Sequence, residues 1–83
     1  MKTYDFTLVL ASGTELTEDL AESLCAAGCR DATAWQSEGV VYVGFDRAAE
    51  SLEQAIRSAI ADVQKTGCTV AKAEIDVPTL QGT

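Results

Sequence analysis

The 83-residue sequence predicts an α+β fold, a ferredoxin-like βαββαβ sandwich with a four-stranded antiparallel sheet. Four segments carry the apolar spacing of strands, and two carry the apolar spacing of helices. A weak repeat supports two similar halves, because Ala27-Gly28-Cys29 and Thr66-Gly67-Cys68 each follow a helical segment. Right-handed βαβ crossovers then give the strand order 4-1-3-2, with both helices on one face of the sheet.

The first strand is expected over residues 4–10, where apolar side chains alternate with Asp5 and Thr7. The following helix has Thr14 or Thr17 as its N-cap, and acidic residues lie in its first turns. Its apolar stripe consists of Leu16, Leu20, Leu24 and Ala27. Gly28 supplies the left-handed residue after the helix, which places Cys29 against the last apolar turn.

The second and third strands are expected to form a hairpin over residues 30–37 and 40–46. Glu38-Gly39 is a suitable two-residue turn between them. Such a turn places Trp35 directly opposite Tyr42 on the neighbouring strand. Because the inward positions hold Val41, Val43 and Phe45, this aromatic pair is expected on the face without helices.

The second helix begins with a capping box, Ser51 at the N-cap and Gln54 three residues later. Gly67 ends it, and a fourth strand is expected over residues 69–77. The inward side chains of that strand are expected to be Ala71, Ala73, Ile75 and Val77. Small inward residues at the sheet margins should let the helices pack closely. The domain is therefore expected to span residues 1–77, with residues 78–83 as a loose tail.

The open face of the sheet is one candidate partner-binding site, and its central residues are Trp35 and Tyr42. Thr7, Val9, Thr33 and Val70 are expected to share this face. Exposed aromatic pairs of this kind mark interfaces with a partner or with a second copy of the chain. The alternative is that the two rings only stabilise the hairpin.

Acidic side chains form the second candidate site. The chain has 13 acidic and six basic residues and a net charge of −7, which disfavours direct binding to nucleic acid. Acidic rows along the first helix and around the start of the second could imitate spaced phosphates and occupy a basic groove, although most charged helix faces are only solvated. The candidate residues are Glu15, Glu18, Asp19, Glu22, Asp46, Glu50 and Glu53.

No catalytic residue, cofactor or metal is predicted, and the protein is expected not to be an enzyme. The sequence has no histidine and no glycine-rich phosphate loop. Three cysteines at irregular spacing, Cys25, Cys29 and Cys68, are expected as free thiols, of which Cys25 is the most exposed. No apolar run is long enough to cross a membrane and no secretory signal is recognisable, so a cytoplasmic location is expected.

Several strings resemble the N-terminal βαββαβ domain of small bacterial helix-turn-helix proteins. They are Tyr4-Asp5-Phe6-Thr7-Leu8, Ala27-Gly28-Cys29 to Asp31-Ala32-Thr33, Val41 to Arg47, and Glu50-Ser51-Leu52-Glu53. The resemblance implies the fold but no catalytic role, and the helix-turn-helix itself is not expected in the few residues after Asp76. In size, acidity and expected fold, the chain is also similar to some phage-encoded anti-CRISPR inhibitors.

Two functions follow as hypotheses. In the first, the protein binds a partner protein with a basic surface, such as a CRISPR effector subunit, and inhibits or regulates a nucleic-acid-handling complex as a DNA mimic. In the second, it is a regulatory or dimerisation domain related to helix-turn-helix regulators that pairs through its open sheet face. Neither hypothesis requires contact with nucleic acid or a membrane.

Overall fold

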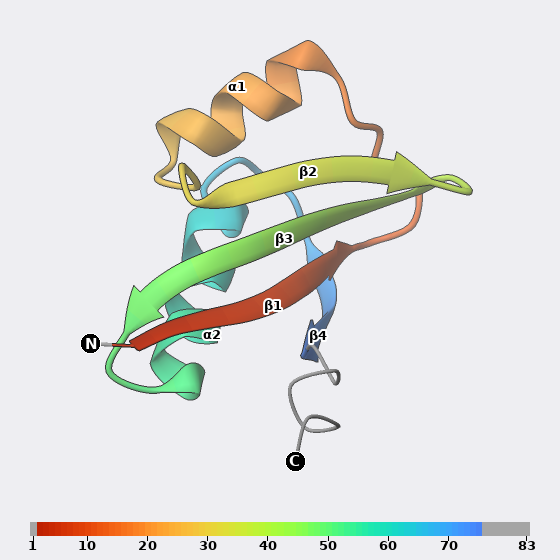
Figure 1. Cartoon of the computed structure of the whole chain (residues 1–83). Coiled ribbons are helices and arrows are strands. Elements are labelled where there is room, and N and C mark those ends of the chain that lie inside the picture. Colours follow the sequence, from red (N-terminus) through yellow and green to blue (C-terminus); the bar gives the residue numbers. More distant parts are fainter. Residues whose placement is uncertain (1, 76–83) are drawn as a thin grey trace.

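The computed structural model describes residues 2–75, which form a sheet of four strands and two helices (Figure 1). In chain order the elements are β1 (Lys2–Leu10), α1 (Glu18–Ala26), β2 (Ala32–Ser37), β3 (Val40–Ala49), α2 (Leu52–Gln64) and β4 (Val70–Ile75). All neighbouring strands are antiparallel, in the order β2-β3-β1-β4. This is the predicted order 4-1-3-2 counted from the opposite edge. The α+β prediction is therefore confirmed, and the arrangement is compatible with a ferredoxin-like sandwich.

A single apolar core lies between one face of the sheet and the two helices. The strands contribute alternate side chains such as Leu8 and Val43, while α1 contributes Leu24 and α2 contributes Ala59 and Val63. In Figure 1, α2 lies behind β3 and β1, and α1 lies beside β2. In the described part of the chain, no helix covers the other face of the sheet. No helix within residues 2–75 is long and apolar enough to cross a bilayer.

The helix ends follow the local signals in the sequence. Of the two possible N-caps of α1, Thr17 is the one used, and its Oγ1 accepts a hydrogen bond from the Leu20 N–H. Ser51 caps α2 in the same way by accepting from the Gln54 N–H. After α1, Gly28 has a φ of 110°, and the Cys29 N–H donates to the Leu24 carbonyl at 3.0 Å. Cys29 is thereby buried, as predicted.

The β2–β3 hairpin also has the predicted register. Glu38 and Gly39 form its turn with φ values of 51° and 80°, the left-handed pair that a tight hairpin turn requires. Trp35 is consequently the direct partner of Tyr42. The strand boundaries differ modestly from expectation, because β2 begins at Ala32 and β3 continues to Ala49.

The margin of the sheet at β4 differs most from the prediction. One extra residue, Ala71, lies between Lys72, which pairs with Val9, and Val70, which pairs with Leu10. This bulge turns Val70 toward the core, so its predicted place on the open face is wrong. Residues 76–83, including Val77 and the predicted tail, lie outside the described residues.

Close helix packing over β4 was also expected, and it is realised only in part, because α2 contacts β4 but leaves Ala73 and Ile75 uncovered. Ala73 and Ile75 face the same side as the core residues Leu8 and Phe6, with which they pair. Both are nevertheless exposed, and Ile75 keeps 52% of its surface. Within the described part of β4, only Val70 packs against the core, although α2 contacts β4 as well as β1 and β3. The sheet therefore has one bare apolar margin.

Candidate functional site: the open face of the sheet

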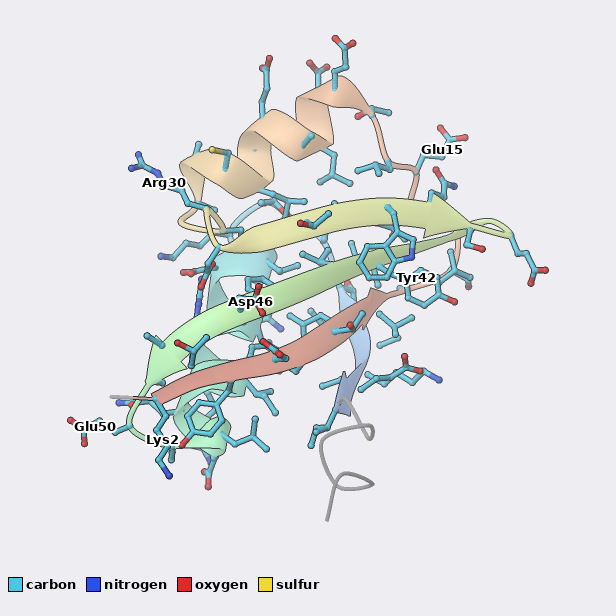
Figure 2. All side chains as sticks on the ribbon, viewed as in Figure 1. Lys2, Glu15, Arg30, Tyr42, Asp46 and Glu50 are labelled. Carbon is cyan, nitrogen blue, oxygen red and sulfur yellow. The ribbon has the colours of Figure 1, made fainter. Side chains whose placement is uncertain are left out.

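Strand alternation determines which side chains reach the open face. Most residues on the core side of the strands are apolar, and the residues between them point to the opposite side. Figure 2 shows this face toward the viewer, with Tyr42 and Asp46 on β3. The face carries Asp5, Thr7 and Val9 from β1, Thr33 and Trp35 from β2, Tyr42, Gly44 and Asp46 from β3, and Lys72 and Glu74 from β4.

An aromatic stack forms one end of this face. The rings of Trp35 and Tyr42 are nearly parallel, 13° apart in plane, with centroids separated by 5.6 Å. Trp35 is 42% exposed even in the stack, so much of the indole remains accessible to a partner. A Cβ added at Gly44 would lie 3.1 Å from Cζ3 of Trp35, which shows that the indole leans across this glycine. The hairpin turn and Gly44 together set the position of the indole ring.

Beside the stack lies an open depression of about 560 Å³. Its lining includes the backbone at Gly44 and the hydroxyl-bearing residues Thr7 and Thr33. Four carboxylates also line it: Asp5, Asp31, Asp46 and Glu74. Among residues 2–75, no basic side chain lines the depression. A shallow acidic surface of this size suits a charged chain segment better than a small apolar ligand, which binds in enclosed apolar pockets.

Two of these carboxylates are direct cross-strand neighbours. Asp5 on β1 pairs with Asp46 on β3, and the described residues provide neither with an ion-pair partner. A hydrogen bond with Asp5 and the charge of Asp5 raise the pKa of Asp46 above its ordinary value. Like charges directly opposite each other destabilise a sheet. A cation supplied from outside would relieve this repulsion.

A third carboxylate of the depression has a partner. Asp31 forms a charged pair with Arg47, whose Nε lies 2.9 Å from its Oδ2. Arg47 also binds Asp62 on α2 at 3.0 Å, and donates hydrogen bonds to the Gly28 carbonyl and the Ser58 hydroxyl. The hydrogen bond from Arg47 holds the pKa of Asp31 below its usual range. This cluster connects β3, α2 and the α1–β2 loop, so its charges serve the fold.

The seven predicted acidic site residues do not form one surface. Figure 2 shows Glu15 beyond the β2 edge, Asp46 on the open face, and Glu50 at the opposite end of the molecule. The α1 row is exposed as expected: Glu18, Asp19 and Glu22. Glu50 and Glu53 flank the N-cap of α2, and Glu53 pairs with Arg57 at 2.8 Å. Asp46, which the sequence grouped with the start of α2, instead lies beside Asp5.

Sequence reasoning missed the contribution of Asp5 to the site. The predicted alternation already placed Asp5 on the open face, but only the register between β1 and β3 reveals that it faces Asp46. That register depends on the whole length of β3, which is longer than predicted. The sequence also provided no indication of the role of Arg47, because the groups that Arg47 binds lie far from it in the chain.

The three cysteines are free thiols with different surroundings. Cys25 is exposed, Cys29 is buried, and Cys68 is intermediate. Burial, followed by the nearby Asp62 charge, raises the pKa of the Cys29 thiol to about 11. Cys25 and Cys29 both line a second hollow of about 260 Å³ between α1 and β2, whose other walls are mainly apolar. This hollow lacks the set of converging polar groups that the open face provides.

Comparisons with known proteins returned no match among family models, curated proteins or solved structures. The resemblance to the domain of helix-turn-helix proteins therefore stays a prediction from sequence strings.

Proposed function

We propose that this protein is a non-enzymatic binding module whose open sheet face takes up a basic segment of another protein. The observation that carries the proposal is the Asp5–Asp46 pair, which lacks a basic partner in the described residues and lies in a depression next to an exposed aromatic stack. Charge, shape and aromatic surface at this place all suit the same kind of ligand.

Arginine side chains fit this combination of groups best. A guanidinium group binds carboxylates through paired hydrogen bonds and also stacks on aromatic rings. The depression offers carboxylates such as Asp5 and Asp46, while the exposed face of Trp35 offers a cation–π surface next to them. The net charge of −7 would attract a basic partner over a longer distance.

Basic segments of this type are common on proteins that hold nucleic acid, because they neutralise backbone phosphates. A bound acidic module would compete with the nucleic acid for the same surface. We therefore propose that the protein inhibits or regulates a nucleic-acid-handling complex, in the manner of a DNA mimic or an anti-CRISPR protein. A CRISPR effector subunit is one partner of this chemistry.

The row on α1 is the rival acidic surface, and a matched pair of double variants separates the two. Asp5→Asn/Asp46→Asn removes two charges from the open face, whereas Glu18→Gln/Glu22→Gln removes two from α1. Each variant is immobilised and used to capture partners from host lysate, and bound protein is then eluted with duplex DNA. The expected result is loss of a DNA-displaceable partner with the first variant and retention with the second.

Three outcomes would argue against this proposal. Loss of the partner only with the α1 variant would move the interface to the helix. Equal loss with both would indicate nonspecific attraction by net charge. If capture yields only the protein itself, and Trp35→Ala abolishes that self-association, the alternative function applies: a dimerisation domain that pairs through the open face.

A further inference from the structure

The outer edge of β4 is a second surface, which adjoins the proposed site through Glu74 and Ile75 in the lining of the depression. In the part of the chain that the structure describes, no strand pairs with the outer edge of β4. Such an edge presents backbone N–H and C=O groups that can pair with another strand. Next to this edge, Ile75 exposes 52% of its surface on the core side of the sheet, and Ala73 is exposed beside it. The margin is therefore both an unpaired edge and an apolar surface.

The other sheet edge is less accessible. Figure 1 shows α1 alongside β2, and the Leu16 N–H before α1 donates to Oε1 of Gln36 on β2. The edge at β4 has no such neighbour within residues 2–75. Within residues 2–75, the β4 edge is therefore the one to which a strand from another molecule can be added.

The charges of β4 are complementary to a second copy of the same strand. Lys72 and Glu74 both lie on the open face, two residues apart, and contact each other at 3.3 Å. In an antiparallel pair of two β4 strands centred on Ala73, Lys72 of each copy lies opposite Glu74 of the other. The two-fold axis makes both ion pairs identical, as in any isologous interface.

Neighbouring registers are less favourable. A shift of the symmetry centre by one residue places either Lys72 opposite Lys72 or Glu74 opposite Glu74. A symmetry centre midway between two residues would place residues such as Lys72 and Ala73 opposite each other. Because directly opposite residues share a face, this register would join the open face of one sheet to the core face of the other. The register centred on Ala73 is thus the one that pairs opposite charges and keeps the faces continuous.

The same register also covers the exposed apolar side chains. Ile75 of each copy would lie opposite Ala71 of the other and next to its Ala73. Opposed residues in this register differ by an even number of positions. The backbone N–H and C=O groups that point away from β1 on one copy therefore meet the equivalent groups of the other copy. The bulge at Ala71 limits the ladder to a few residues, which predicts a reversible dimer rather than a permanent one.

We infer that two copies of this chain associate through antiparallel pairing of their β4 edges, centred on Ala73, to form one continuous eight-stranded sheet. The net charge of −7 on each copy opposes the association at low salt. At roughly physiological ionic strength the Debye length is about 8 Å, so most of that repulsion is screened. Opposed side chains about 5 Å apart interact within this distance.

Charge exchange tests the register directly. Sedimentation equilibrium of the full chain at increasing concentration should show a monomer–dimer equilibrium. Lys72→Glu and Glu74→Lys should each weaken dimerisation by roughly tenfold or more, because each places like charges opposite each other twice per dimer. A mixture of these two variants should form a heterodimer, and the double exchange K72E/E74K should recover the dimer.

The matched control is Arg57→Glu, which changes net charge as Lys72→Glu does but lies on α2 in an exposed pair with Glu53. It should leave the equilibrium nearly unchanged. The inference is overturned if the chain stays monomeric at its highest soluble concentration, or if the single exchanges leave the dimer intact. A dimer that is lost with Trp35→Ala but kept in both charge variants would also overturn it, because the open face would then be the interface.

Discussion

Two adjacent residues on β3, Asp46 and Arg47, have opposite electrostatic surroundings. Asp46 points to the open face, where its cross-strand neighbour is another carboxylate, Asp5. Arg47 points to the other side, where it is 11% exposed and binds Asp31 and Asp62. The pKa of Asp46 is raised by Asp5, and the pKa of Asp31 is lowered by Arg47. One cluster is neutralised within the fold, and the other has no internal counter-charge in the described residues.

The difference shows that net charge alone does not identify a binding surface. Thirteen acidic residues are distributed over the chain, but carboxylates with an internal cation contribute to stability and have little attraction left for a partner. Carboxylates that repel each other destabilise the free protein, and a cation from outside relieves that repulsion.

Replacing Arg47 with methionine should destabilise the protein by about 2–4 kcal/mol, because two partly buried carboxylates lose their cation. The Gly28 carbonyl and the Ser58 hydroxyl would lose a donor as well. Urea unfolding measures the change. Arg57→Met is the control, since Arg57 is exposed and its ion pair with Glu53 should contribute less than about 1 kcal/mol. Similar losses for both variants would contradict a structural role for the Arg47 cluster.

The two clusters should respond to acid in opposite directions. Because the pKa of Asp31 is lower in the folded protein, its ionised form stabilises the fold above pH 3.8, the ordinary value, and this stabilisation is lost as pH falls through the lowered pKa. Asp46 has a raised pKa, so its ionised form disfavours folding, and this disadvantage disappears below pH 3.8. Carboxyl NMR titration of the native chain measures both directions.

In the Arg47→Met protein, the same titration should show a higher pKa for Asp31 and a smaller change at Asp46, because the Asp31 charge is the weakest of the causes that raise the pKa of Asp46. A change at Asp46 as large as that at Asp31 would contradict the separation of the two clusters.

Asp46→Asn should leave the fold intact and slightly increase stability at neutral pH, because it removes the repulsion from Asp5. Asp31→Asn should reduce stability under the same conditions, because it removes a partner of Arg47. Urea midpoints at neutral pH and near pH 3 distinguish the two, since both differences should shrink in acid. A loss of stability in Asp46→Asn at neutral pH would mean that the Asp5–Asp46 pair supports the fold.

Thiol labelling should measure how often the structure opens around Cys29, which lies near the Arg47 cluster. Cys25 is exposed and should react first with iodoacetamide at about pH 8, while Cys29 reacts slowly because it is buried and its pKa is about 11. In Arg47→Met, the labelling of Cys29 should accelerate as local opening becomes more frequent. Peptide mass spectrometry gives the order, and fast labelling of Cys29 in the native chain would contradict its packing.

Local signals in the sequence predicted most of the fold. The caps at Thr17 and Ser51, the reversal at Gly28 and the turn at Glu38-Gly39 each depend on a few neighbouring residues. The β4 margin depends on a bulge and on where α2 lies, and no local pattern encodes either of these. Predicted inward positions on β4 were therefore exposed, and Val70 reached the core instead of the open face.

The candidate site was only partly predictable for the same reason. The turn length alone gives the Trp35–Tyr42 stack, because it determines the register of adjacent strands. The Asp5–Asp46 pair joins residues 41 positions apart, and it depends on the pairing of β1 with the full length of β3. Rows of acidic residues along α1 are visible in the sequence, whereas carboxylates that meet between strands are not.

The position of Trp35 gives the open face its own spectroscopic signal. Trp35 is the single tryptophan in the chain, and its indole is partly exposed and stacked on Tyr42. Intrinsic emission from this protein therefore originates at one end of the acidic depression and reflects the polarity and quenching at that place. A ligand that reaches this face should change the emission without any label. Pairing at β4, which lies on the far side of β3 and β1 from β2, should leave it nearly constant.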